Sequence, residues 1–132
     1  MNNIRLLLVD DEEDFRITLT ARLKRRNIDV VDVSSGEKAI ELIRNNKFDV
    51  VIVDIKMPGI DGIETLRYLK RIDPLLEVIL LTGHASVEAG IEGIKLGAYD
   101  YIVKPCNLND LLSKVEDAHR RRHIEEERIR EK

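Results

Sequence analysis

The segment VVIVDIKMPGIDG, residues 50–62, begins with four apolar residues and then changes to polar, proline and glycine residues. The run Val50–Val53 lacks the alternation of a strand with one solvent-exposed face, which is typical of a parallel strand covered by helices on both faces. Asp54 ends the run, and Pro58 and Gly59 favour a turn directly after it. The segment therefore predicts a buried strand that leads through a turn into a helix, the repeating unit of an α/β fold.

Further apolar runs of the same kind predict the other strands, at Ile4–Val9, Val30–Val33, Val78–Leu81 and Tyr99–Val103. The stretches between the runs carry apolar residues at helical spacing, for example Phe15, Leu19 and Leu23. Strand followed by helix, repeated five times, predicts a three-layer α/β/α sandwich with right-handed crossovers. We expect a parallel five-stranded sheet with the strand order 2-1-3-4-5.

The composition limits the class of protein. The chain has 132 residues, 43% hydrophobic and 36% charged, which fits one domain with its own core. A net charge of -3 and a pI near 5.7 argue against direct binding to nucleic acid. No apolar run reaches the roughly 18 residues of a membrane span. The single cysteine, Cys106, cannot form an internal disulfide and no signal-like segment is visible, so we expect a cytoplasmic protein.

The end of the chain is rich in both charge signs. We expect residues 1–118 to form the domain and residues 119–132 to extend its last helix as a solvated segment with i,i+4 ion pairs. His119 and His123 have a spacing that could chelate zinc, but the arginines between them oppose a cation, and we interpret both as surface residues. We expect Arg120–Arg122 to form a solvated charged face.

Acidic residues stand where two of the predicted strands end. Asp10 and Asp11 follow the first strand, and Asp54 ends the third, so the predicted strand order brings all three to one crevice. Carboxylates this close repel one another unless they share a cation. Oxygen ligands favour Mg²⁺, with Mn²⁺ as an alternative, over Zn²⁺. The competing interpretation is that such acids are loop residues or helix N-caps, since Asp11–Asp14 could start the first helix.

The remaining strand ends carry a hydroxyl and an ammonium group. Thr82 ends the fourth strand and Lys104 follows the fifth. A hydroxyl, a fixed cation, a divalent metal and a carboxylate together form a site for phosphoryl transfer. Asp54 is the expected nucleophile, because its strand lies between those that carry the other groups.

The stretches VDDEEDF, DIKMPGIDG, LTGHAS and GAYDYIVKP, in this order and at these intervals, resemble the receiver domain of bacterial two-component response regulators. The resemblance covers residues 4 to about 118 and implies the flavodoxin-like receiver fold. By position, Asp54 resembles the phospho-accepting aspartate. The resemblance further implies that Mg²⁺ is held by Asp11, Asp54 and the backbone carbonyl of Lys56, with Asp10 assisting through water.

Other positions acquire roles through the same resemblance. Thr82 and Lys104 resemble the phosphate-contacting residues of the family, and Tyr101 resembles its switch aromatic. Lys56 and His84 stand two residues after Asp54 and Thr82, at variable positions that tune the lifetime of the phosphoryl group. The Lys104–Pro105 bond resembles one that the family holds in cis.

The resemblance implies a signalling protein rather than an enzyme with a substrate of its own. It would accept a phosphoryl group from a phosphohistidine on a sensor histidine kinase or a phosphotransfer protein, and would catalyse only this modification and its slow hydrolysis. Phosphorylation would remodel the face of helix 4, strand 5 and helix 5, and we expect homodimers to form through that face.

Two other functions compete with this interpretation. A Mg²⁺-dependent phosphohydrolase of the haloacid dehalogenase type would need a second aspartate two residues after Asp54, where this chain has Lys56. A receiver that acts only as a constitutive docking module would not need the complete set of acids, Thr82 and Lys104. Both alternatives are therefore disfavoured.

Two glycines lie inside the fourth predicted helix. Gly90 and Gly93 each cost a helix about 0.5–1 kcal/mol relative to alanine. They either loosen this helix before phosphorylation or permit close packing, and the sequence leaves both explanations open.

Overall fold

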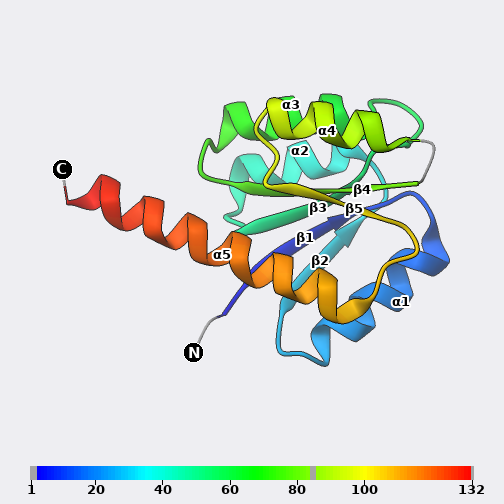
Figure 1. Ribbon diagram of the computed structural model, residues 1–132, viewed down its shortest axis with the longest axis horizontal. Coiled ribbons are helices and arrows are strands. Elements are labelled where there is room, and N and C mark those ends of the chain that lie inside the picture. Colours follow the sequence, from blue (N-terminus) through cyan, green and yellow to red (C-terminus); the bar gives the residue numbers. More distant parts are fainter. Residues whose placement is uncertain (1–2, 84–85, 132) are drawn as a thin grey trace.

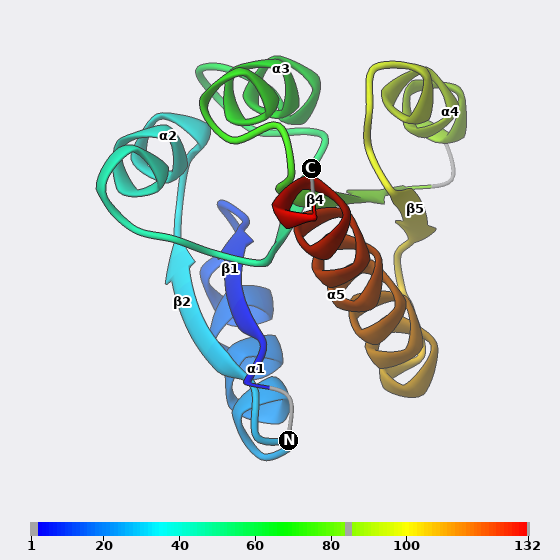
Figure 2. The same ribbon diagram turned by 90° about the vertical axis from the view of Figure 1, so that its left-hand side faces the viewer.

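The computed structural model describes residues 3–83 and 86–131. It has three layers, with a central sheet that is covered by α1 and α5 on one face and by α2, α3 and α4 on the other (Figures 1 and 2). The predicted α/β/α sandwich is therefore confirmed.

The sheet is parallel throughout and has the strand order β2-β1-β3-β4-β5, as predicted. Its strands are β1 (Arg5–Val9), β2 (Asp29–Val33), β3 (Val50–Asp54), β4 (Glu77–Thr82) and β5 (Asp100–Val103). Each strand begins and ends within one residue of its predicted bounds, because the apolar runs that define the strands are also the segments that become buried.

The helices are α1 (Glu13–Lys24), α2 (Gly36–Asn45), α3 (Gly62–Ile72), α4 (Val87–Lys95) and α5 (Leu108–Arg130). Three of them are preceded by an N-cap residue whose side chain accepts a hydrogen bond from a backbone N–H of the first turn. These N-cap residues are Ser35, Asp61 and Asn107. In the part of the chain that the structure describes, no helix is both long and apolar enough to cross a membrane.

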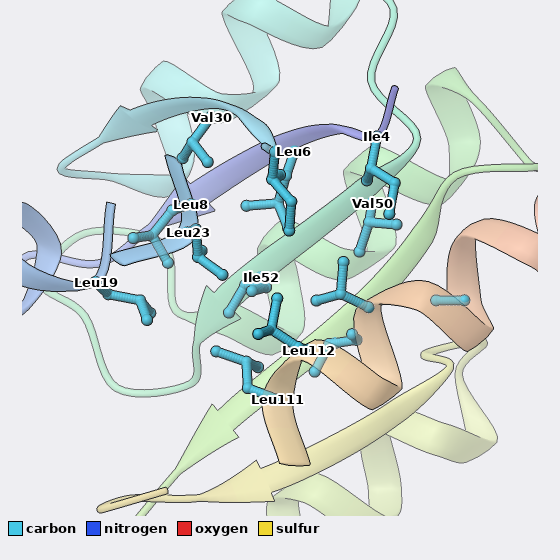
Figure 3. Close-up of a cluster of buried hydrophobic side chains, with 14 of the residues drawn as sticks. Ile4, Leu6, Leu8, Leu19, Leu23, Val30, Val50, Ile52, Leu111 and Leu112 are labelled. Carbon is cyan, nitrogen blue, oxygen red and sulfur yellow. The ribbon is translucent and has the colours of Figure 1, made fainter. Parts of the chain in front are cut away.

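The core has two parts, one on each face of the sheet. Side chains of β1 and β3 pack against α1 and α5 on the first face, where Leu8 and Ile52 lie close to Leu23 and Leu111 (Figure 3). On the second face, the alternate residues of the same strands pack against α2 and α3. The central strands are buried on both sides, which explains their uninterrupted apolar sequence.

The last helix is held by arginines at the edge of the sheet where the parallel strands begin. Arg122 is 4% exposed, and its guanidinium donates hydrogen bonds to the carbonyl oxygen of Phe48 (3.1 Å) and to Asp73 Oδ2 (2.9 Å). Arg121 forms two hydrogen bonds with the carboxylate of Glu77, which is 4% exposed. The expectation of a solvated face is thus wrong for Arg122, because acceptors outside α5 surround it.

The glycines of α4, Gly90 and Gly93, are buried where the helix packs on the sheet. A Cβ atom on Gly90 would be 2.8 Å from Tyr101 Cγ, and one on Gly93 would be 2.2 Å from Leu80 Cδ1. Both distances are shorter than van der Waals contact, so the absence of a side chain permits this packing. The close-packing explanation for these glycines is therefore supported.

Candidate functional site

The predicted site residues gather at the edge of the sheet where the parallel strands end. Asp10 follows β1, Asp54 ends β3, Thr82 ends β4 and Lys104 follows β5. An open cavity at this edge is lined by Asp11, Glu12, Asp54, Ile55, Lys56, Thr82, Gly83, Ser86 and Lys104. The buried Asp10 is not part of this lining but contacts Lys104. Residues separated by up to 94 positions in the sequence thus contact one another.

Lys104 connects the acids of this site. Its Nζ lies 2.9 Å from Asp10 Oδ2, 3.0 Å from Asp54 Oδ2 and 3.1 Å from Glu12 Oε1. Burial alone would lower the pKa of Lys104, but the hydrogen bonds to Asp10 and Asp54 outweigh it and raise the pKa above its ordinary value. The lysine is therefore a fixed cation at neutral pH.

Asp10 is fully buried. Its Oδ1 accepts a hydrogen bond of 2.9 Å from the backbone N–H of Glu12. Burial raises the pKa of Asp10, against the opposing effect of the hydrogen bonds from Glu12 and Lys104. This carboxylate is thus held by a backbone donor and a cation, and an additional cation would favour its charged form.

Asp54 has the same pattern of partners. Its Oδ1 accepts a hydrogen bond of 3.1 Å from the backbone N–H of Lys56, and its Oδ2 is bound by Lys104. A Cβ atom on Gly62 would lie 2.5 Å from the backbone oxygen of Asp54, so only glycine lets α3 begin this close to the acid. The Asp54 side chain is 11% exposed and borders the cavity.

Within the described residues, the carboxylate oxygens of Asp10, Glu12 and Asp54 lie within 4.8 Å of one another and could share a metal ion. Such a set of oxygen donors fits Mg²⁺. Asp11 is exposed and lines the cavity, but it does not belong to this close group. Glu12 does belong to it and was not among the metal ligands expected from the sequence, all of which were residues at a strand end or just after one.

The N-cap interpretation of the acids after β1 is not supported. The residue at the N-cap position of α1 is Glu12, and its side chain makes no capping hydrogen bond. Asp10 accepts a hydrogen bond from the backbone N–H of Glu12, which precedes the first residue of α1. Asp10 and Glu12 are therefore directed to Lys104 rather than to the first turn of the helix.

Thr82 and Tyr101 lie on the neighbouring strands β4 and β5. Thr82 is 1% exposed, and its hydroxyl donates a hydrogen bond of 3.0 Å to the carbonyl oxygen of Gly83. Tyr101 is half-buried and contacts α4 at Gly90. In this arrangement the hydroxyl is not bonded to Asp54, and the aromatic ring lies beside α4.

Residues 6–116 match the family described as the response regulator receiver domain. The chain belongs to this family. It is 37% identical over 123 residues to the transcriptional regulatory protein ZraR of Escherichia coli O157:H7, an alignment that covers 93% of this chain and 28% of that protein. The receiver thus spans less than a third of the length of this curated relative.

Solved receiver structures have the same fold. A response regulator receiver domain protein from Clostridium thermocellum is 33% identical, with a TM-score of 0.88 over 92% of this chain and 98% of that one. NtrX from Brucella abortus is 27% identical, with a TM-score of 0.91 over 99% of this chain and 30% of that one. The predicted resemblance to receiver domains is confirmed.

Lys56 and His84, the two residues predicted to tune the lifetime of the phosphoryl group, stand two positions after Asp54 and Thr82 in the sequence. Lys56 is exposed at the cavity, where its backbone N–H binds Asp54. His84 lies outside the residues that the structure describes. A Cβ atom on Gly83 would meet no atom of residues 3–83 and 86–131 within 4 Å, apart from its neighbours in the chain.

Cys106 of the receiver lies just beyond the site and packs, half-buried, against the core formed with α1 and α5. Burial raises the pKa of its thiol above the ordinary value. The predominant form at neutral pH is therefore the less reactive thiol. The preceding Lys104–Pro105 peptide bond is cis, as the resemblance implied.

Proposed function

We propose that this receiver accepts a phosphoryl group on Asp54 from a phosphohistidine of a sensor histidine kinase or phosphotransfer protein. The observation that carries the proposal is the ammonium of Lys104, which contacts both Asp54 and the buried Asp10 at the mouth of an open cavity. A carboxylate next to a fixed cation, accessible from one side, is suited to receive an anionic group.

The chemistry assigns a task to each side chain. An oxygen of Asp54 forms the bond to phosphorus as the phosphorus–nitrogen bond breaks, and the leaving imidazole keeps the electron pair. Lys104 neutralises charge on the phosphoryl oxygens, and the Thr82 hydroxyl turns from Gly83 to donate to one of them. Mg²⁺, or Mn²⁺ in its place, would be held by Asp11, Asp54 and the carbonyl of Lys56, with Asp10 acting through water, and would supply further positive charge.

The same proposal includes the switch. When Thr82 turns toward the phosphoryl group it leaves space on β4, and Tyr101 rotates into it. The ring contacts α4 at Gly90, so its movement changes the packing of α4 on β5. Phosphorylation would then shift the population between two packings of the α4-β5-α5 face, through which we expect homodimers to form.

The output lies outside this receiver in our proposal. The curated relative ZraR is named a transcriptional regulatory protein, and the chain covers 28% of its length. Nucleic-acid binding would then belong to an output domain, whereas this acidic receiver would not bind nucleic acid itself. We also propose a cytoplasmic location for this receiver, and a helical extension over residues 119–132 that Arg121 and Arg122 hold to the domain.

The test is the intact mass of the protein after incubation with acetyl phosphate and Mg²⁺. Wild type should gain one phosphoryl group, whereas Asp54→Ala should gain none. A phosphohydrolase, the disfavoured alternative, would instead release phosphate from the donor through many turnovers. A gain of mass in Asp54→Ala equal to that of wild type would refute the assignment of Asp54.

A further inference from the structure

Glu12 has an orientation that its place in the helix does not explain. It occupies the N-cap position of α1, where Ser, Thr, Asp or Asn are favoured, and its side chain makes no capping hydrogen bond. Instead its Oε1 lies 3.1 Å from Lys104 Nζ, although 65% of the side chain is exposed. The side chain is thus directed into the site across 92 positions of sequence.

Lys104 has no hydrogen left for a new partner. An ammonium group has three N–H donors. The acceptors of Lys104 are three carboxylates, those of Asp10, Asp54 and Glu12. The ammonium also lies over the ring of Phe15, with Nζ 4.2 Å from the ring centroid. Contact with a phosphoryl oxygen therefore requires that one of the carboxylates be released.

The three carboxylates differ in how readily they can be released. Asp10 is fully buried, so the loss of Lys104 would leave its charge with only a backbone donor. Asp54 is the residue that carries the phosphoryl group and stays beside the lysine. Glu12 is the most exposed of the three, and water can replace Lys104 at its carboxylate at small cost.

We propose that Glu12 holds Lys104 in the resting receiver and is the partner that the lysine releases when the phosphoryl group arrives. This inference rests on the proposed function, since it assigns Lys104 to the phosphoryl group. Glu12 is then a positioning residue that restrains phosphorylation. Its negative charge also lines the cavity, where it repels an anionic donor.

The chain offers a matched control one residue further along. Glu13 is exposed at the start of α1, and no ion pair of its side chain is found within residues 3–83 and 86–131. Glu12→Gln and Glu13→Gln therefore change the net charge equally, as do Glu12→Ala and Glu13→Ala. Each substitution at residue 12 keeps the backbone N–H that binds Asp10.

The first measurement is the rate of phosphorylation by acetyl phosphate at saturating Mg²⁺ and low ionic strength. Because an exposed ion pair is weak, Glu12→Gln and Glu12→Ala should accelerate the reaction by about two- to fivefold, and the Glu13 variants should match wild type. Equal acceleration by the Glu13 variants, or no acceleration by the Glu12 variants, would overturn the inference.

The second measurement needs neither donor nor metal. Brief labelling of lysine amines with an acylating reagent, followed by peptide mass spectrometry, reports how firmly Lys104 is held. Lys104 should react faster in Glu12→Ala than in wild type or Glu13→Ala, because one acceptor of its ammonium is gone. Unchanged labelling in Glu12→Ala would overturn the inference, whereas a wild-type protein that gains no phosphoryl group would overturn the proposed function as well.

Discussion

Arg122 of α5 donates a hydrogen bond of 2.9 Å to Asp73, the residue that follows α3, and so joins helices on opposite faces of the sheet. A second bond runs to the carbonyl oxygen of Phe48, before β3. Because Arg122 is 4% exposed, its guanidinium cannot exchange these acceptors for water without local opening. The extended part of α5 is thereby fixed to the edge of the sheet opposite to Asp54.

Arg122→Ala should destabilise the protein by about 2–3 kcal/mol, the usual cost of removing a buried hydrogen bond to a charged partner. The measurement is unfolding in urea, followed by circular dichroism. Arg120→Ala is the control, because Arg120 is exposed and pairs with Asp117 of the same helix, and it should change stability by less than about 0.5 kcal/mol. Equal effects of the two substitutions would show that the buried contacts are unimportant.

A second prediction concerns the end of the domain, which we expected at residue 118. A chain that stops after Ala118 loses Arg121 and Arg122 and leaves the buried carboxylate of Glu77 without its guanidinium partner. A chain that stops after Glu127 keeps both arginines. The first truncation should lower the free energy of unfolding by at least about 3 kcal/mol and the second by less than about 1 kcal/mol. Equal stabilities would support a domain that is complete at residue 118.

The strands and the position of the site could be predicted because both follow from local sequence. A buried parallel strand is a run of apolar residues, and the polar residue that ends it must lie at one edge of the sheet. For this reason Asp10, Asp54, Thr82 and Lys104 were expected together. In the structure Asp54, Thr82 and Lys104 line one cavity, and the buried Asp10 contacts Lys104.

The contacts of Glu12 and Arg122 were not predicted, and the physical reason is the same for both. Each belongs to a charged stretch in which neighbouring residues are chemically alike, so the sequence does not indicate which side chain meets a partner. The partners are distant in the chain, Lys104 for Glu12 and Asp73 for Arg122. Such pairings depend on side-chain direction after the helices have packed, and helical periodicity alone does not provide it.

A third prediction concerns the packing of α4. In an exposed helix, Gly→Ala stabilises by about 0.5–1 kcal/mol. Gly93→Ala should instead destabilise by about 1–3 kcal/mol, because the new Cβ would lie 2.2 Å from Leu80 Cδ1 in the core. Urea unfolding provides the test, with Gly83→Ala as the control at a position with open space. A more stable Gly93→Ala protein would mean that α4 moves away from β4 at little cost.

The last prediction concerns pH and Mg²⁺ at Asp10. Its folded-state pKa is raised, so the folded protein binds this proton more tightly than the unfolded chain does, and the Asp10 contribution to stability falls as pH rises through that pKa. The Asp10→Asn variant should therefore lose less stability than wild type as the pH rises toward neutrality.

Mg²⁺ at a concentration 100 times its dissociation constant should stabilise wild type by about 2.7 kcal/mol, and it should stabilise Asp10→Asn markedly less. Thermal unfolding with and without Mg²⁺ measures both effects, and Asp14→Asn, at an exposed acid of α1, should behave as wild type. If Asp10→Asn and Asp14→Asn respond alike to Mg²⁺, the metal acts through general screening rather than at this site.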